Sequence, residues 1–509
     1  MTRQVTFLVC LFFFPCVCDA QSVRQKGVAE REQNNESPIT KPNVLLIVTD
    51  EHNFRTLGCY RKLMPREQAE MWGIGAVVPT PNIDQLSKEG VICTRAYATS
   101  PVCTPCRAAM FTGRYPHATG APQNNLTLDR RIPTLADRLG DAGYRTGYFG
   151  KWHLAGEGKP EWAPLVDGGF RFKKYMFNRG HWKKFIIENG SPAVGARKKQ
   201  SPTYGLDGAD EQTFATDWLT DRTLEFLAEG DEDQPFLAVL SYPDPHGPNT
   251  VRAPYDRRFD DLPFQPPRTF QRKDRPATPK WLGSSQKHEV FRGDQMSKYF
   301  GMVQCIDDNI GRIYEHLSDR GKLDETLLIL TSDHGDLCYE HDRLNKGNPY
   351  EGSARVPFVL RFPPRIKAGE YYTQPIGTVD LTPTTMGLLS LQADPNDHGR
   401  DLSKELADAG TAREQRKSAH VTFLRSGGMV SNWVAAIDDR YKLVLSVDDV
   451  PWLFDRAQDP DELVNFYGRE ETKRVSRRLG LALKQYAKDF DDPAFETTAI
   501  AAALGEIVK

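Results

Sequence analysis

The chain has 509 residues, of which 39% are hydrophobic and 26% are charged, a composition typical of soluble globular proteins. The formal net charge of -2 shows neither the basic excess that favours nucleic-acid binding nor the acidic excess of a solvating tail. The length suffices for one large domain and a smaller one.

The first 20 residues predict a secretory signal peptide. Arg3 supplies a positive start, residues 5–17 are almost wholly apolar, and the small residue Ala20 provides a cleavage point. The apolar run is shorter than the about 20 residues that a membrane-spanning helix needs, and we expect no span elsewhere. We therefore expect an exported protein, periplasmic or extracellular, in which the polar residues 21–41 form a flexible leader.

Strands and helices are expected to alternate after the leader. In chain order they are a strand at 43–50, a helix at 80–90, a strand at 91–100, a helix at 134–143, a strand at 144–150, a helix at 217–230, a strand at 235–242, a helix at 297–321 and a strand at 326–333. This alternation predicts an α/β fold with a large, mostly parallel sheet sandwiched by helices, which we assign to residues 42–414. Ligands collect at the carboxyl ends of such strands.

Two long segments, 158–210 and 247–295, lack clean periodicity and hold many Pro, Gly, Lys and Arg residues. We interpret them as surface insertions, which commonly select the substrate. Arg179, Lys183 and Lys184 in the first insertion could contact a polyanion, but we predict a solvated loop.

The pattern changes at about residue 415. Four short apolar runs with turn signals between them predict strands at 420–424, 432–437, 441–446 and 451–455, and a helix is expected near 470–490. Residues 415–509 are therefore expected to form a small C-terminal subdomain with an antiparallel sheet.

Nine cysteines are present, of which three lie in the predicted signal peptide. The remaining six are too sparse for a disulfide framework. Two of them, Cys103 and Cys106, stand on either side of a Thr-Pro pair and directly before Arg107. From these residues alone, a disulfide, a metal site, a thiol nucleophile and a modified residue are all possible.

Six polar clusters follow the expected strands or lie in the loops after them. They are TDEH (49–52), CTPCR (103–107), GKWHLAG (150–156), PDPHGP (243–248), SDHGD (332–336) and NKGNPYEGSARVP (345–357). Carboxylate oxygens suit a hard divalent cation, whereas lysine and arginine suit a tetrahedral oxyanion. A metal with a cationic cradle indicates phosphoryl or sulfuryl transfer. Lys151 and His153 lie two residues apart, so an extended segment would direct both side chains to one face.

The stretch CTPCRAAMFTGR (103–114) resembles the signature of the sulfatase family, Cys/Ser-x-Pro-x-Arg followed by Thr-Gly-Arg. GKWHLAG resembles the second signature of that family, and the other clusters match in the same order. The similarity extends from residue 41 to about residue 465. It implies an alkaline-phosphatase-like fold and a sulfuric ester hydrolase. The predicted signal peptide and the long insertions suggest a sulfated carbohydrate as the substrate.

The resemblance also implies a modified nucleophile. Cys103 would be oxidised to formylglycine (3-oxoalanine) by a formylglycine-generating enzyme during maturation. The aldehyde would hydrate to a diol, of which one hydroxyl attacks sulfur and the other later expels sulfate. Cys106 is expected to have a structural role.

A role follows for each further site residue from the resemblance. One Ca²⁺ per chain would be bound by Asp50, Asp333, His334 and residue 103, with Glu51 as a further candidate ligand. Arg107 would hold the diol, His153 would deprotonate it, Lys151 and Lys346 would bind sulfate oxygens, and His246 and Lys346 would assist the leaving group.

Two alternative functions are compatible with the sequence. A phosphonate or phosphate ester hydrolase of the same superfamily can carry the same Cys-x-Pro-x-Arg signature. A non-catalytic sulfoglycan-binding protein would result if Cys103 escaped modification.

In addition, Asn125–Thr127 (NLT) is a glycosylation sequon.

Overall fold

The computed structural model describes residues 41–230, 233–272, 278–282, 287–409 and 420–509. The predicted signal peptide, nearly all of the predicted leader and the predicted domain boundary at 414/415 lie outside these residues. Among the helices in the described ranges, none combines the length and the apolar composition that a membrane crossing needs.

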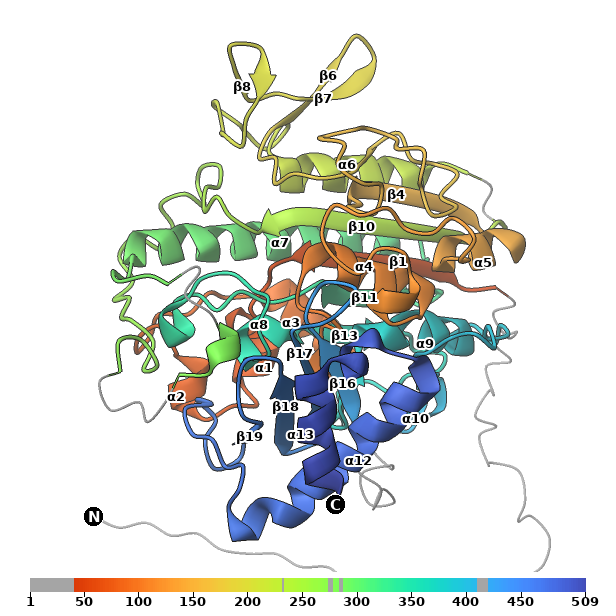
Figure 1. Cartoon of the computed structure of the whole chain (residues 1–509). Helices are drawn as coiled ribbons and strands as arrows, with labels where there is room; N and C mark the ends of the chain where they lie inside the picture. The colour runs from red at the N-terminus through yellow and green to blue at the C-terminus, as the bar shows by residue number, and fades with distance from the viewer. Residues whose placement is uncertain (1–40, 231–232, 273–277, 283–286, 410–419) are drawn as a thin grey trace, which may run out of the picture. The chain divides into compact units, whose positions relative to one another are not determined.

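An eight-stranded sheet forms the centre of the fold (Figure 1). In this sheet β13 runs antiparallel to both of its neighbours, whereas the other neighbouring strands are parallel. The predicted large, mostly parallel sheet is therefore confirmed. In spatial order the strands are β14 (Glu370–Tyr372), β2 (Val91–Cys93), β13 (Phe358–Arg361), β11 (Thr326–Ser332), β1 (Asn43–Asp50), β10 (Phe236–Pro245), β4 (Arg145–Lys151) and β5 (Met176–Phe177).

Helices cover both faces of this sheet because successive strand residues point to opposite sides. In β1, Leu46 belongs to one apolar cluster and Ile47 to the other, which explains the unbroken apolar sequence of this strand. On the Ile47 side lie α3 (Pro81–Lys88), α6 (Ala215–Ala228) and α7 (Gly293–Asp319), and on the Leu46 side lie α4 (Cys103–Thr112), α5 (Leu135–Asp141) and α9 (Leu381–Leu388). Shorter helices are η1 (Phe54–Thr56), α1 (Gly58–Arg61), α2 (Arg66–Ala69), α8 (Glu351–Ala354) and α10 (Ser403–Ala407).

The carboxyl ends of four neighbouring parallel strands, β11, β1, β10 and β4, lie at one edge of the sheet. Asp50 ends β1, Lys151 ends β4 and Asp333 follows β11 directly. Helix α4, whose residues are all buried, begins at Cys103 and ends at Gly113, where a φ of 71° favours glycine. Polar clusters that are distant in sequence therefore meet at this edge.

The structure corrects the strand predicted at 91–100. This segment divides into β2 and β3 (Ala96–Tyr97), because β3 leaves the large sheet to pair with β12 (Arg355–Val356) and β15 (Ile376–Gly377). The first insertion is also more ordered than a plain loop. It contains β5 and two hairpins, formed by β6 (Phe185–Glu188) with β7 (Ser191–Val194) and by β8 (Arg197–Lys198) with β9 (Ser201–Pro202).

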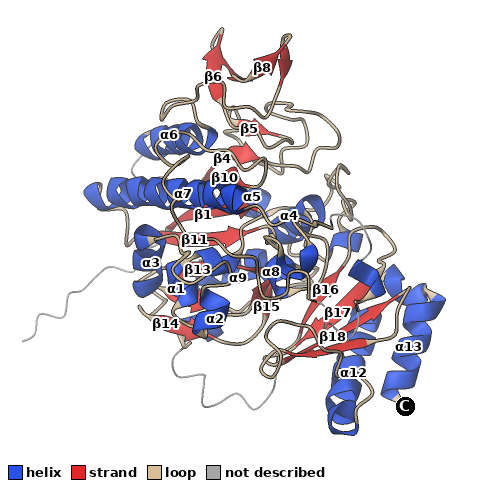
Figure 2. Cartoon of the chain, turned by 90° about the vertical axis from the view of Figure 1, so that its left-hand side faces the viewer, coloured by secondary structure: helices blue, strands red, loops and turns tan. Residues whose placement is uncertain are grey.

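A second, antiparallel sheet lies near the C-terminus (Figure 2). Helices α12 (Lys473–Phe490) and α13 (Thr498–Val508) pack on one of its faces. Its other face packs on Tyr97, Leu337 and Tyr350 of the larger part of the chain. The predicted C-terminal antiparallel sheet is confirmed; its strands are β16 (Thr422–Arg425), β17 (Trp433–Ile437), β18 (Tyr441–Ser446) and β19 (Trp452–Asp455).

Candidate active site

Cys103 lies where the first turn of α4 meets the carboxyl ends of the central strands. Its Sγ atom is 3.2 Å from His334 Nε2, 3.6 Å from Lys151 Nζ and 3.7 Å from Asp50 Oδ1. Burial raises the pKa of the Cys103 thiol, but Lys151 and Lys346 outweigh it and hold the pKa well below its usual value. The surroundings of residue 103 therefore stabilise a negative charge.

Arg107 lies one helical turn after Cys103 and is completely buried. Its Nε atom donates to Asp333 Oδ2 over 2.8 Å, and Nη1 donates to the main-chain oxygen of Lys151 over 2.6 Å and to Ser241 Oγ over 2.8 Å. The remaining nitrogen, Nη2, has no hydrogen-bond partner among the described residues. The guanidinium is therefore held in place and retains a donor for a ligand.

Four buried residues, Asp50, Cys103, Asp333 and His334, form a cluster of potential metal ligands. Each offers one ligand atom, and these atoms all lie within 4.8 Å of one another. Burial and the neighbouring Asp50 raise the pKa of Asp333. A divalent cation would relieve this repulsion between carboxylates, and carboxylate oxygens suit a hard cation. The residues present therefore fit the predicted metal site.

Glu51, His246 and Lys346 form a second group next to this cluster. Glu51 Oε2 lies 2.9 Å from His246 Nε2, and Glu51 Oε1 lies 3.3 Å from Lys346 Nζ. Lys346 Nζ also lies 2.6 Å from His246 Nε2, and His246 Nδ1 is 2.9 Å from the main-chain oxygen of Gly247. Because the carboxylate of Glu51 faces these two basic groups, its ligation of a metal stays a prediction.

The prediction that Lys151 and His153 share one face of an extended segment is wrong in its geometry. Strand β4 ends at Lys151, and His153 has a left-handed φ of 63°. Both side chains nevertheless belong to the site: Lys151 Nζ forms an ion pair with Asp50, and the neighbouring Cys103 acts on the pKa of His153. His153 Nε2 lies 3.1 Å from Asn125 Oδ1, and burial lowers the pKa of His153 to about 4. Its imidazole is therefore neutral at pH 7.

His181 is a candidate that sequence reasoning missed. Its Nε2 atom lies 3.1 Å from Lys151 Nζ and 3.7 Å from Asp50 Oδ2. Its ring stacks on the ring of His246, with the centroids 3.4 Å apart and the planes inclined by 9°. Burial is the main cause that lowers the pKa of His181 well below its usual value. The sequence gives one weak indication of this role, because His181 lies in a basic segment. No motif with a fixed spacing includes it.

A cavity of about 230 Å³ lies in the first insertion, lined by Lys159, Trp182, Pro202, Thr203 and Tyr204. Lys159 Nζ is 4.7 Å from the centroid of the Tyr204 ring and 5.6 Å from that of the Trp182 ring. The ring centroids of Tyr204 and His181 are 5.8 Å apart, so this cavity adjoins the site. Aromatic faces beside a lysine suit a sugar ring with an anionic substituent.

The structure contradicts the predicted solvated loop at Lys183, which is completely buried. Its Nζ atom donates to Asp244 Oδ1 over 2.6 Å and to the main-chain oxygen of His246 over 2.9 Å. Asp244 also accepts from the Thr216 hydroxyl over 2.7 Å. This pair connects the insertion to the loop of His246, so the charge of Lys183 is compensated inside the protein.

We expect Lys183→Ala to destabilise the fold by about 3–5 kcal/mol, because it leaves the buried Asp244 carboxylate without its cation. The neighbouring Lys184 is half-buried, and its ammonium group donates to the main-chain oxygen of Asp207 and forms no ion pair with a carboxylate among the described residues. Lys184→Ala should therefore change stability by less than about 0.5 kcal/mol. Urea unfolding midpoints of the two variants measure the difference, and equal midpoints would contradict a structural role for the Lys183–Asp244 pair.

Two family models match the chain. The model described as Sulfatase matches residues 42–391, and the model described as N-sulphoglucosamine sulphohydrolase, C-terminal, matches residues 339–489. The chain is 29% identical over 480 residues to the uncharacterized sulfatase YidJ of Escherichia coli, covering 89% of this chain and 88% of the relative. It is 25% identical over 524 residues to N-acetylglucosamine-6-O-sulfatase of Bacteroides thetaiotaomicron, covering 89% and 87%.

Solved structures share the fold. One is a complex with the substrate D-glucosamine-2-N,6-O-disulfate; its TM-score is 0.71 at 22% identity, covering 89% of this chain and 98% of the other. Another is the phosphonate monoester hydrolase of Agrobacterium radiobacter, with a TM-score of 0.66 at 25% identity, covering 88% and 95%. The expected sulfatase and alkaline-phosphatase-like architecture is therefore confirmed.

Proposed function

This chain belongs to the sulfatase family, and we propose that it hydrolyses sulfate esters of a carbohydrate at a formylglycine made from Cys103. One observation carries the proposal. Buried Cys103 contacts Asp50 and His334, the neighbouring members of the cluster of potential metal ligands, and also the ammonium group of Lys151. Hydrolysis of a charged ester needs a nucleophile, an electrophilic metal and an oxyanion-binding cation at one point.

We assign the metal to Ca²⁺, one ion per chain, with Asp50, Asp333, His334 and residue 103 as its ligands. When bound, the ion would polarise the sulfate oxygens and favour ionisation of the hydrated residue 103. Conversion of the Cys103 side chain to an aldehyde removes two electrons and releases the sulfur at the oxidation level of sulfide. A formylglycine-generating enzyme would catalyse this step during maturation, with an external oxidant that accepts the electrons.

The basic side chains around residue 103 would bind the sulfate group. Lys151 Nζ lies 3.6 Å from Cys103 Sγ, and Lys346 contributes to the low pKa of the thiol. Burial opposes the charge of Lys346, but Cys103 and Glu51 raise the pKa of the ammonium group well above its usual value, so the charge persists. The donor at Arg107 Nη2 would hold an oxygen on residue 103.

Two histidines would move protons on opposite sides of the reaction. His153 is neutral and its Nδ1 atom has no hydrogen-bond partner among the described residues, so it would take up a proton from a hydroxyl at the neighbouring residue 103. His246 lies 2.6 Å from Lys346 Nζ and would pass a proton to the leaving oxygen. His181, stacked on His246, would keep the His246 ring in its orientation.

A carbohydrate substrate is supported by the cavity beside His181, with Trp182, Tyr204 and Lys159 in its wall. It is also supported by relatives whose names specify sulfated sugars as substrates. An exported location would suit such a substrate and agrees with the apolar run at 5–17.

The activity is tested by rates on four substrate classes: an aryl sulfate, an aryl phosphate, a phosphonate monoester and sulfated oligosaccharides. We expect sulfate esters to be preferred and at least one sulfated oligosaccharide to be hydrolysed. Preference for the phosphonate would favour a phosphonate hydrolase instead, an alternative motivated by the similarity to the Agrobacterium radiobacter enzyme. Binding of sulfoglycans without release of sulfate would favour the non-catalytic alternative.

We expect His246→Ala to impair hydrolysis of sugar sulfates far more than hydrolysis of an activated aryl sulfate. A general acid contributes about 10²–10⁴-fold, and its contribution is largest when a poor leaving group develops charge on the bridging oxygen. His153→Ala is the matched control and should slow both substrates by similar factors. Equal losses on the two substrates in His246→Ala would refute the leaving-group role.

A further inference from the structure

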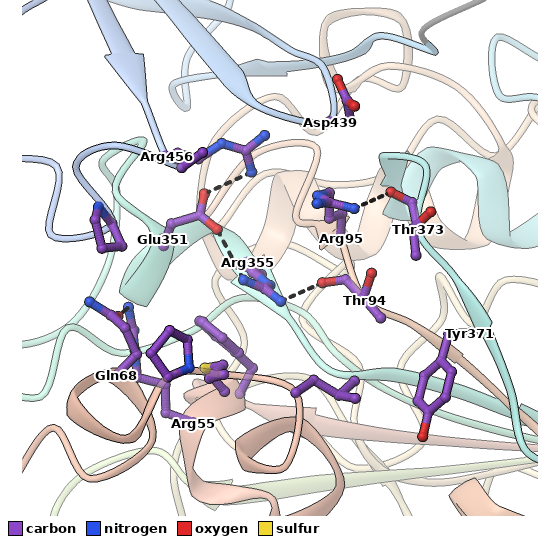
Figure 3. A pocket seen from close by; sticks show the side chains of 16 residues that line it. Arg55, Gln68, Thr94, Arg95, Glu351, Arg355, Tyr371, Thr373, Asp439 and Arg456 are labelled. Carbon is purple, nitrogen blue, oxygen red and sulfur yellow. Dashed lines mark hydrogen bonds and ion pairs between the residues drawn. The ribbon is translucent and has the colours of Figure 1, made fainter. Parts of the chain in front are cut away.

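A cavity of about 550 Å³ lies where residues of the large sheet and of the C-terminal sheet meet (Figure 3). Its lining shares no residue with the active-site groups described above. The walls come from η1, the α1–α2 segment, the β2–β3 link, α8, β12, β14, the β17–β18 turn and the loop after β19. Four arginines, Arg55, Arg95, Arg355 and Arg456, line it together with two carboxylates, Glu351 and Asp439.

Glu351 cannot neutralise the cations around it. Its carboxylate lies 3.4 Å from Arg355 Nη1, 3.6 Å from Arg456 Nη1 and 2.9 Å from Nζ of the buried Lys442. Figure 3 shows Glu351 between the two arginines. Glu462 pairs with Lys442 over 2.7 Å, which leaves Arg355 and Arg456 to share one carboxylate. Their Nη atoms already donate to oxygens of the protein, and their Nε atoms are buried, so these two arginines would act on a ligand mainly through their charge.

Arg95 adds a further positive charge to this wall. Its Nη1 atom donates to the main-chain oxygen of Thr373, and it forms no ion pair with a carboxylate of the described residues. Burial lowers the pKa of Arg95, and Arg456 and Arg355 lower it further, whereas Tyr97 and the exposed Asp439 oppose this effect. Three guanidinium groups are therefore crowded together, and a bound anion would relieve their repulsion.

Arg55 does not contribute to this excess, because it forms an ion pair with Glu340 over 2.9 Å. Another part of the wall is apolar and accessible. Leu63 and Tyr371 are 41% and 47% exposed, and Met64 and Pro65 lie beside them in the lining. The pocket thus combines a cationic wall with apolar surface, which suits an anionic group attached to a ring.

We propose that this pocket is a second saccharide-binding site, in which Arg95, Arg355 and Arg456 hold a sulfate or carboxylate group of an anionic glycan. The inference rests on the proposed carbohydrate substrate for its choice of ligand. Guanidinium groups bind such oxyanions through paired hydrogen bonds. A site remote from the reacting ester would retain a polymeric substrate between successive cleavages, because a second contact raises the effective concentration of the chain at the active site.

The test is binding of a heparin octasaccharide to the full-length enzyme by calorimetry. We expect Arg95→Gln to raise the dissociation constant about tenfold or more, because it removes a charged hydrogen-bond donor. Tyr371→Ala, at an exposed position, should also weaken binding. Arg66→Gln is the matched control, since Arg66 lies near the pocket in sequence but outside its lining and is exposed. All three variants should hydrolyse a small aryl sulfate at the wild-type rate, which also shows that they fold.

Equal weakening by Arg95→Gln and Arg66→Gln would overturn the proposal, because it would indicate diffuse surface attraction. Unchanged binding in Arg95→Gln would overturn it as well. Competition by sodium sulfate is a further outcome to distinguish. If sulfate binds the wild type about as tightly as the octasaccharide does and displaces it, and if this competition is lost in Arg95→Gln, the pocket is a site for a free anion and the proposal is overturned. If the wild type hydrolyses no sulfated saccharide but Arg95→Gln still weakens binding, the proposed function fails and the second site stands.

Discussion

Replacing Cys103 with alanine should abolish hydrolysis of sulfate esters while the protein remains folded. The thiol position is the point where Asp50, His334 and Lys151 converge, and no other described nucleophile occupies it. Removing a catalytic nucleophile costs about 10⁴-fold or more in turnover. Rates on an aryl sulfate, compared with circular dichroism and the unfolding midpoint of the same preparation, measure the two effects separately.

Cys106→Ala provides the matched control on the same helix. Cys106 is buried, and burial raises the pKa of its thiol above the usual range, so it remains protonated. Its Sγ atom lies 3.2 Å from Thr378 Oγ1 rather than in the metal-ligand cluster. We expect this variant to lose some stability and to keep its activity. Retained turnover in Cys103→Ala, or equal loss in Cys106→Ala, would refute a catalytic residue at 103.

Asp50→Asn should remove the bound divalent ion and lower activity by at least about 100-fold. Mutation of a residue that only hydrogen-bonds a metal ligand already lowers metal affinity or activity about 10–100-fold. Asp50→Asn goes further, because it removes a charged ligand from the cluster itself. The wild type should contain about one Ca²⁺ per chain. After treatment with a chelator, added Ca²⁺ should raise the unfolding temperature of the wild type but not that of Asp50→Asn.

Asp307→Asn is the control for this effect, because Asp307 is also buried but lies on α7, outside the cluster. Burial raises its pKa to about 7, and its two oxygens accept the main-chain N–H groups of Asn82 and Ile83 separately. An asparagine has one oxygen and keeps only one of these bonds, so the variant should lose some stability. This variant should bind Ca²⁺ normally. Stoichiometric zinc without calcium in the wild type would contradict the assigned ion.

Sequence reasoning could predict the fold and the centre of the site for a physical reason. Buried parallel strands have continuous apolar sequences, and ligands gather at their carboxyl ends. Asp50, Lys151 and Asp333 stand at those ends, so the strand pattern alone places them together. Cys103 and Arg107 follow from their spacing of four residues, which puts both on one face of α4.

Other contacts depend on chain folding that has no local pattern. Lys183 is neutralised by Asp244, which is 61 residues away, so sequence gave no sign that this lysine is buried. His181 reaches the site only because the insertion folds over His246. His153 required a left-handed turn after β4, which the extended reading of that segment did not include.

Mass spectrometry of the peptide that contains residue 103 tests the central claim most directly. Protein produced with a formylglycine-generating enzyme should carry an aldehyde there, seen as the loss of one sulfur and two hydrogens, the gain of one oxygen and a reaction with a hydrazide reagent. Sulfatase activity should rise in proportion to the aldehyde fraction across preparations. Full activity in a preparation whose residue 103 is entirely thiol would contradict the account.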